Sequence, residues 1–209
     1  MSIVERVRKV ADGAALMSGT TVEATVFSGV SNLIGNTPLE QAMQAEMERL
    51  GPIEFDDADR DFAREIQKTL SKDDIAVSFR RCGMPPPPED MALCDFVAPL
   101  DLPNQGGNGS TDVGDVSWAV PTVQARIATC AVGTVFHTWQ TVAQGKSPMA
   151  HKGMVYAAKV MAATAKRLIE DPDLRAAAKT AHADYLAKTP YVCPIPDDAV
   201  PPIVPRAAE

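Results

Sequence analysis

The first thirty residues constrain the fold most, because the helix and the strand that they predict cannot form a hydrophobic core together. Apolar side chains recur at helical spacing over residues 3–18, and Gly19 can end that helix. Residues 20–27 then alternate apolar and polar side chains, which predicts a half-buried strand. One helix and one strand bury too little surface to be stable alone. We therefore expect this opening to be one piece of a larger α+β unit.

Four further helices are predicted by apolar stripes with capping signals at their ends. They cover residues 37–50, 57–70, 153–170 and 172–187. In the first of these, Thr37 is the expected N-cap, Pro38 suits the first helical position, and Glu40 can complete a capping box. Asp171 is the expected cap of the last helix.

The chain between these helices predicts two strands and one long irregular segment. Strand-like stretches cover residues 122–128 and 131–136. Residues 82–110 contain a proline run and end in a Gly/Asn-rich stretch, so no regular element is expected there. Long irregular segments inside compact domains are often functional.

The formal net charge of -7 makes nucleic acid and anionic membranes poor candidates for binding partners. No apolar run approaches the roughly 20 residues that a membrane span requires, and the N-terminus lacks the apolar core of a secretory signal. The four cysteines are scattered, without a Cys-x-x-Cys pair, which argues against a disulfide framework and against a thiolate zinc site. We therefore expect a cytoplasmic protein with reduced thiols.

Two of the three histidines, His137 and His151, stand close together in a segment rich in Gly, Ser and Thr. Asp112 and Asp115 precede them in the loop 109–118. Imidazole and carboxylate groups are the usual ligands of a hydrolytic metal centre. No compact motif such as His-x-Asp or His-x-x-x-His is present, so these residues predict only part of a metal-dependent site.

Each of these residues also has an ordinary structural explanation. A histidine that follows apolar residues, as His137 does, often only makes a hydrogen bond, and His151 could be a surface residue or a cap at the start of a helix. Aspartates in loops rich in Gly, Ser and Thr form Asx turns without any chemistry. Trp118 could belong to the core, and His182, within a predicted helix, is expected to be structural.

Three motifs lie between Gly109 and Met154. They are Gly-Ser-Thr-Asp-Val-Gly-Asp-Val-Ser-Trp at 109–118, His-Thr-Trp-Gln at 137–140 and Gly-Lys-Ser-Pro-Met-Ala-His-Lys-Gly-Met at 145–154. Together they resemble the C-terminal part of the aminobenzoyl-glutamate utilization protein B family, a branch of the co-catalytic metallopeptidases related to aminoacylases and carboxypeptidases. The opening at residues 5–20 and Tyr-Val-Cys-Pro-Ile-Pro at 191–196 are similar to the same family.

The resemblance implies an α/β fold, in which a sheet flanked by helices forms a catalytic domain that is interrupted by a smaller α+β lid domain. By resemblance, residues 1–30 are the C-terminal remnant of the lid or dimerisation domain. Residues 36–190 are then the C-terminal half of the catalytic domain, and residues 191–209 form a Pro-rich tail. The half that supplies most metal ligands and the general-base glutamate in the family would be missing from this chain.

The resemblance also assigns roles to individual residues. His137 matches the further metal ligand that family members contribute ahead of the long helix. His151 stays a rival for that role and is otherwise expected to be catalytic, because residues 145–153 look like an insertion before that helix. Asp112 and Asp115 are expected near the site as supporting catalytic groups. The expected substrate-binding side chains are Ser117, Trp118 and Lys152.

The expected function is metal-dependent hydrolysis, with zinc or manganese, of the amide bond in a small N-acyl amino acid such as aminobenzoyl-glutamate. In the family reaction, two divalent metals polarise the carbonyl group and activate a water, and a glutamate moves the proton. The alternative is a non-catalytic fragment or subunit that binds no metal by itself. Such a chain would need a partner, either the missing N-terminal half or a second copy in an oligomer.

Overall fold

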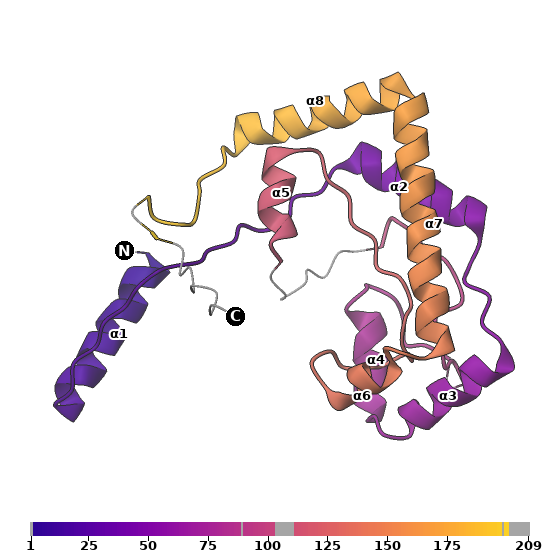
Figure 1. Ribbon diagram of the computed structural model, residues 1–209, viewed down its shortest axis with the longest axis horizontal. Helices are drawn as coiled ribbons and strands as arrows, with labels where there is room; N and C mark the ends of the chain where they lie inside the picture. Colours follow the sequence, from indigo (N-terminus) through magenta and orange to yellow (C-terminus); the bar gives the residue numbers. More distant parts are fainter. Residues whose placement is uncertain (1, 89, 103–110, 198, 201–209) are drawn as a thin grey trace, which may run out of the picture. The chain divides into compact units, whose positions relative to one another are not determined.

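The computed structural model describes residues 2–88, 90–102, 111–197 and 199–200. Helices supply the regular structure, and no strand occurs in these ranges (Figure 1). The Gly/Asn-rich stretch 104–110, with Gly109 and Ser110 of the predicted site loop, lies outside the described residues.

The chain divides into two compact units. The first unit is Met1–Ser31 with Tyr191–Glu209, and the second unit is Asn32–Pro190. This division falls close to the boundary predicted at residues 30–36, except that the C-terminal tail joins the first unit. The assignment of these parts to a lid and to a catalytic domain stays a prediction.

Helix α1 (Ile3–Ser18) in the first unit confirms the first predicted helix. The Ser2 hydroxyl accepts a hydrogen bond from the Glu5 N–H, and the Glu5 carboxylate accepts one from the Ser2 N–H. At the other end, Gly19 adopts a left-handed φ of 66°. No side chain of α1 is buried against the described residues, so capping and helix propensity define this helix rather than packing.

The strand predicted at residues 20–27 is wrong, because no described part of the chain pairs with it. Val22, which the alternation places on the apolar face, is 46% exposed. A strand satisfies its backbone N–H and C=O groups only through a neighbouring strand. Alternation therefore indicates that a segment suits a sheet, but it cannot supply the second strand.

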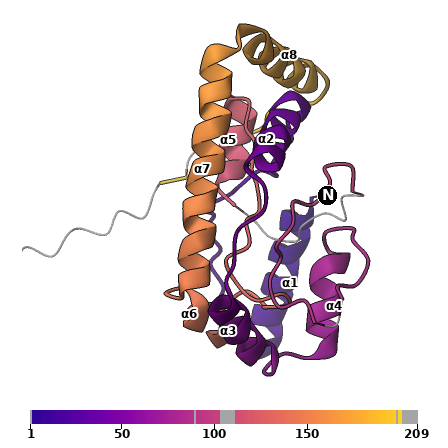
Figure 2. The same ribbon diagram turned by 90° about the vertical axis from the view of Figure 1, so that its right-hand side faces the viewer.

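Within its described residues, the second unit is built from helices α2 to α8. Their bounds are α2 Thr37–Leu50, α3 Asp57–Gln67, α4 Lys72–Arg80, α5 Val113–Ala119, α6 Trp139–Gln144, α7 Pro148–Glu170 and α8 Pro172–Lys188. Helix α2 packs against α7 and α8, and α8 turns away from the C-terminal end of α7. Helices α3 and α6 lie near the N-terminal end of α7, and α4 lies farther from it (Figure 2). Helix α5 lies toward α8.

Helix α2 begins where the sequence predicted, but Asn36 and not Thr37 is its cap. The Asn36 side-chain oxygen accepts a hydrogen bond from the Leu39 N–H at 3.3 Å. Its side-chain nitrogen donates to the Ala178 carbonyl oxygen in α8 at 2.9 Å. One buried asparagine thus caps α2 and also ties it to α8.

Helix α7 begins at Pro148, ahead of the start that was predicted at residue 153. The Ser147 hydroxyl caps it by accepting a hydrogen bond from the Ala150 N–H at 3.2 Å, and proline suits the first helical turn. Residues 148–153 therefore belong to this helix, and the insertion expected at residues 145–153 stays a prediction.

The main core of the second unit forms where α3, the start of α7 and two irregular segments meet. Its buried side chains are Phe55, Ala63, Ile66, Ala92, Leu93, Ala131 and Met149. Burying a large aliphatic side chain contributes about 1.5–3 kcal/mol, so this cluster can hold segments that have no secondary structure. The Val132 N–H donates to the Ala92 carbonyl oxygen at 2.9 Å and joins the two segments directly.

The predicted α/β fold class is wrong, because the described residues form no sheet. Residues 122–128 belong to no helix or strand, and residues 131–136 contain turns instead of a strand. In these turns the Thr134 N–H donates to the Ala131 carbonyl oxygen at 3.1 Å, and Gly133 adopts a φ of 94°. A left-handed glycine interrupts a strand, which explains why the apolar stretch 131–136 does not extend.

The four cysteines are free thiols, as the sequence predicted. Burial raises the pKa of the Cys94 and Cys130 thiols, which makes both less reactive. Among the helices of the described residues, none is both long and apolar enough to cross a membrane.

Gly153 marks the closest approach of α7 to the extended segment, and its replacement should destabilise the second unit. A Cβ atom there would lie 2.2 Å from the Ala128 carbonyl oxygen. Gly153→Ala should cost about 1–3 kcal/mol of unfolding free energy, because overpacking outweighs the better helix propensity of alanine. At Gly145, where a Cβ would meet only the Val142 carbonyl oxygen at 3.6 Å, the same substitution should change stability by less than about 0.5 kcal/mol. The midpoints of urea unfolding are compared for the two variants. Equal midpoints would contradict the close approach of Gly153 to the Ala128 carbonyl oxygen.

Candidate functional site

The turn at residues 135–138 presents His137 to solvent just before α6. His137 adopts a left-handed φ of 65°, which is uncommon for a residue other than glycine and often marks a functional turn. The hydroxyls of Thr138 and Thr141 hold the turn by donating to the Val135 carbonyl oxygen, at 2.6 and 2.9 Å. Because the residue is exposed, its imidazole is accessible to a ligand.

Two glutamines brace the chain that leads into this turn. The buried Gln144 accepts a hydrogen bond from the Ala131 N–H at 2.7 Å and donates to the Thr134 hydroxyl at 3.1 Å. Gln67 of α3 donates to the Val132 carbonyl oxygen at 3.1 Å. The turn that carries His137 therefore starts from a fixed point in the core.

Apolar side chains stand next to His137 on the surface. Phe136, Trp139 and Val142 are 66%, 61% and 79% exposed. Trp139 and Val142 are three residues apart and share one side of α6. A group of exposed apolar side chains is typical of an interaction surface.

His151 lies in the first turn of α7 and is exposed. It does not cap the helix, since Ser147 does, and its backbone N–H donates to the Ser147 carbonyl oxygen at 3.1 Å. No hydrogen bond or ion pair joins its ring to any residue that the structure describes. The ring is therefore accessible, as that of His137 is.

Asp112 and Asp115 lie at the start of α5, which the sequence had predicted as a loop. Asp112 occupies the N-cap position without making a side-chain capping bond and is exposed, whereas Asp115 is half-buried in the first turn. Acidic side chains at this end of a helix interact favourably with its dipole, so their position has a structural explanation as well.

Ser117 and Trp118 connect α5 to the segment at the start of the second unit. The buried Ser117 hydroxyl accepts a hydrogen bond from the Ile34 N–H at 3.0 Å. The Trp118 indole nitrogen donates to the Asn32 carbonyl oxygen at 2.8 Å. His182 Nε2 lies 2.9 Å from the Ser117 carbonyl oxygen, an acceptor, so the ring donates this bond. This bond links α8 to α5, and the structural role expected for His182 stays a prediction.

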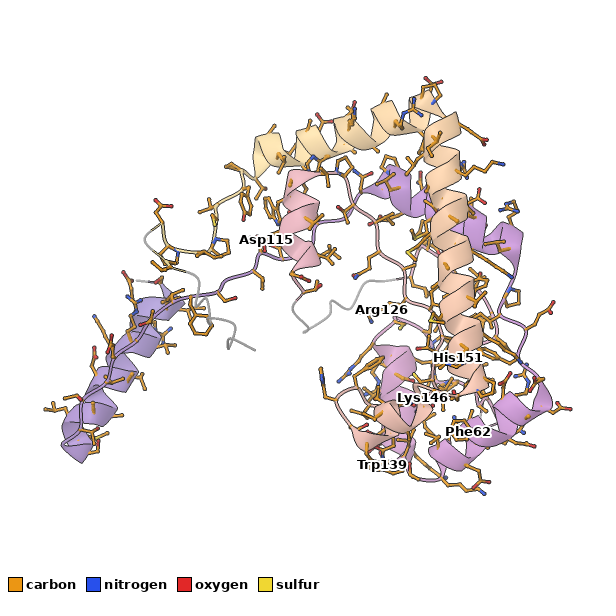
Figure 3. All side chains as sticks on the ribbon, viewed as in Figure 1. Phe62, Asp115, Arg126, Trp139, Lys146 and His151 are labelled. Carbon is orange, nitrogen blue, oxygen red and sulfur yellow. The ribbon has the colours of Figure 1, made fainter. Side chains whose placement is uncertain are left out.

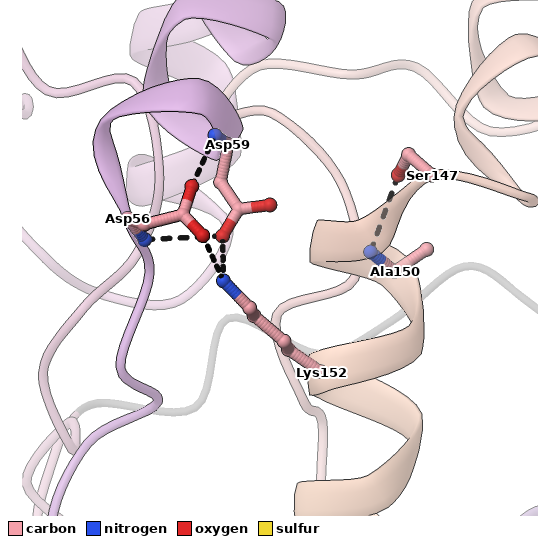
Figure 4. Close-up of polar contacts among 5 residues, drawn as sticks. All are labelled: Asp56, Asp59, Ser147, Ala150 and Lys152. Carbon is pink, nitrogen blue, oxygen red and sulfur yellow. Dashed lines mark hydrogen bonds and ion pairs between the residues drawn. The ribbon is translucent and has the colours of Figure 1, made fainter.

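Lys152 of α7 contacts two aspartates at the start of α3 (Figure 4). Its Nζ lies 2.7 Å from a carboxylate oxygen of Asp56 and also pairs with Asp59, whose side chain is 2% exposed. The two aspartates form the capping box of α3 as well. The hydrogen bond with Lys152 lowers the pKa of Asp56, and the bond with Asp56 raises the pKa of Lys152. Lys152 thus neutralises a buried carboxylate.

The predicted site residues lie at two separate places in the second unit. Figure 3 shows Asp115 on α5 far from Trp139 and His151. His137 precedes Trp139 by two residues and so belongs to the same end as His151. In the described part of the chain, no three His, Cys, Asp or Glu side chains are grouped as a metal site requires. The roles assigned to these residues from the sequence stay predictions.

Sequence reasoning missed the side chains that position the turn and α7, namely Gln67, Gln144 and Asp59. The pattern Asp56-x-x-Asp59 at the start of a helix is a capping signal that could have drawn attention to Asp59. The glutamines have no local signal, because Gln67 contacts a backbone carbonyl 65 residues away in the sequence.

The chain is similar to a subunit of p-aminobenzoyl-glutamate hydrolase from Escherichia coli (strain K12). The two are 38% identical over 208 residues, which are 95% of this chain and 43% of that relative. The chain therefore spans less than half the length of this relative. The resemblance predicted from the motifs is confirmed, and the coverage is consistent with a match to one part of the relative. No protein-family model and no solved structure matches the chain.

Removal of the Lys152 charge should destabilise the second unit, because the buried Asp59 carboxylate would lose its cation. Lys152→Met keeps an unbranched apolar stem, so the variant tests the charge more than the packing. Lys159→Met, at an exposed position of the same helix, is the matched control and should leave the midpoint of urea unfolding nearly unchanged. Equal midpoints for both variants and the wild type would show that the ion pair is not formed.

The same pair predicts how stability depends on pH. Because the pKa of Asp56 is lowered from 3.8, its contribution is present above pH 3.8 and is lost as the pH falls through the lowered value. Because the pKa of Lys152 is raised from 10.5, its contribution is present below pH 10.5 and is lost as the pH rises through the raised value. The stability difference between the wild type and Lys152→Met should therefore be largest between these limits and shrink on either side. A difference that stays constant in pH-dependent unfolding would contradict the pairing.

Proposed function

We propose that this chain takes part in the hydrolysis of an N-acyl amino acid amide such as aminobenzoyl-glutamate. The observation that carries the proposal is the similarity to the p-aminobenzoyl-glutamate hydrolase subunit along 95% of the chain. Since the chain spans 43% of that relative, we assign the activity to this chain together with a part like the remainder of the relative. The four free thiols support a cytoplasmic location.

His137 is the residue of this chain that we propose as a metal ligand. Its imidazole is exposed on a turn that is braced from the core, so a ligand would meet a side chain whose backbone is already in place. The described residues by themselves do not fit a divalent metal, since they group no three ligand side chains. The proposal therefore requires that a part like the remainder of the relative supplies the other ligands of a zinc or manganese ion. His151, at the same end of the unit, is the rival for this role.

The other predicted site residues receive narrower roles in this proposal. Asp112 and Asp115 would support the site only if a part like the remainder of the relative brings α5 into it, because α5 lies apart from His151. Because Lys152 is paired with the buried Asp59, we assign it to holding α7 against the start of α3 rather than to binding substrate. Ser117 and Trp118 would act indirectly, since protein groups already occupy their polar atoms.

A non-catalytic subunit is the second candidate function. The exposed apolar side chains of Phe136, Trp139 and Val142 favour it, because they suit contact with another protein as well as with a substrate. The partner would then be a polypeptide like the remainder of the relative, or a second copy of this chain.

Hydrolysis of p-aminobenzoyl-glutamate tests the proposal directly. The chain is assayed alone and after co-expression with the part of the E. coli relative that it does not match, with zinc or manganese supplied. We expect turnover by the co-expressed pair, and His137→Ala should lower turnover and metal affinity about 100-fold or more while leaving the unfolding midpoint unchanged. His151→Ala is the comparison, since a larger loss there would transfer the ligand role to His151. Full turnover with His137→Ala would overturn the proposed ligand, and no turnover in any combination would favour the non-catalytic subunit.

A further inference from the structure

Helix α6 and the residues that follow it present a row of apolar and basic side chains to solvent. Trp139, Val142 and Lys146 are spaced by three and four residues, which places neighbours on one side of a helix. Gly145, between the last two, keeps helical φ and ψ of -60° and -22°. Figure 3 shows Trp139 and Lys146 at the same end of the second unit. The row therefore begins just after His137 and ends at a lysine.

The two tryptophans of the chain have different surroundings. Trp118 is buried, donates to the Asn32 carbonyl oxygen and contacts the Tyr185 ring with a centroid distance of 5.7 Å. Trp139 is 61% exposed, and its indole makes no hydrogen bond or ring contact with another residue that the structure describes. Phe136, three residues earlier, is 66% exposed. An exposed aromatic plane of this kind suits a second aromatic ring, because offset stacking adds to the effect of burial.

The charge around this row is positive, although the chain as a whole is acidic. Residues 116–169 contain no Asp or Glu and six Lys or Arg, whereas the full chain has 27 acidic and 20 basic residues. Acidic side chains from outside this stretch pair with Lys152, Lys166 and Arg167. Lys146 is exposed and forms no ion pair with the described residues. The row thus combines an aromatic plane with an unpaired positive charge.

A small ligand fits this row better than a protein does. A stable protein interface takes about 20–30 residues on each side, and lysine is depleted at the centre of such interfaces. The exposed apolar side chains here are few, and a lysine stands at the end of their row. Seven helical residues, the separation of Trp139 and Lys146, rise by roughly 10 Å. An aromatic acyl group joined through an amide to an anionic amino acid is of comparable length, and the flexible lysine stem adapts to the difference.

We propose that Trp139 and Lys146 determine the specificity of this chain for its substrate. Trp139 stacks on the aromatic ring of the acyl group, with Phe136 beside it, and Lys146 pairs with a carboxylate of the amino acid. The ligand class is an N-acyl amino acid with an aromatic acyl group and an acidic amino acid. The inference rests on the proposed function for the reaction that follows, but binding is measured without any hydrolysis.

The first experiment observes the two indole N–H signals of the full 209-residue chain by NMR. The probe is p-aminobenzoyl-glutamate, and Trp139→Leu assigns the signals because it removes one of them. The ligand should shift the Trp139 signal and leave that of the buried Trp118 in place. N-acetylglutamate, which lacks the ring, should bind about tenfold more weakly. An unchanged Trp139 signal at millimolar ligand, or equal shifts of both signals, would overturn the inference.

Replacement of the lysine tests the charge separately from the ring. Lys146→Gln should weaken binding of p-aminobenzoyl-glutamate about threefold and leave binding of p-aminobenzamide, which has no carboxylate, unchanged. Lys159→Gln is the matched control, since Lys159 is also an exposed lysine of the second unit. The unfolding midpoints of both variants should equal that of the wild type, because the side chains are exposed. Equal weakening by the two variants would mean that only net charge matters, and this would overturn the role of Lys146.

Activity measurements separate this inference from the proposed function. When the chain is co-expressed with the unmatched part of the E. coli relative, Trp139→Leu should lower the preference in kcat/KM for p-aminobenzoyl-glutamate over N-acetylglutamate about tenfold. An unchanged preference would overturn the inference while the proposed function stands. Binding as expected without any hydrolysis would support the inference while the proposed function fails. Self-association that Trp139→Leu abolishes, with no ligand-induced shift in the wild type, would identify a second copy as the occupant and overturn the inference.

Discussion

Side-chain amides and hydroxyls satisfy several backbone groups of the described residues, which form no sheet that could do so. Buried backbone groups require hydrogen-bond partners, and an unmet one costs about 1–3 kcal/mol. In the second unit the buried Gln144 accepts a hydrogen bond from the Ala131 N–H, and the buried Ser117 accepts one from the Ile34 N–H. These bonds fix irregular segments to helices. The segments that contain Ile34 and Ala131, and with the latter the turn with His137, are positioned in part by these side chains.

The helices could be predicted because their signals act within a few residues of the chain. Periodic apolar residues and Gly19 indicated α1, and Pro38 indicated the first turn of α2, although the cap is Asn36 and not Thr37. The start of α7 was missed although Ser147 before a proline is a capping signal of the same kind. Helices α4, α5 and α6 were missed because helices of nine, seven and six residues contain too few apolar positions to show a period.

The sheet and the site could not be predicted from local pattern, because both depend on contacts between distant residues. Alternation indicated a strand at residues 20–27 but could not provide a second strand to pair with it. Lys152 and Asp59 pair across 93 residues of sequence, and nothing near either one indicates the other. Motif similarity, in turn, grouped Asp115 with His151, whereas the structure places them at separate ends of the unit. Shared motifs indicate that two chains are related, but packing sets the distance in space between the residues of those motifs.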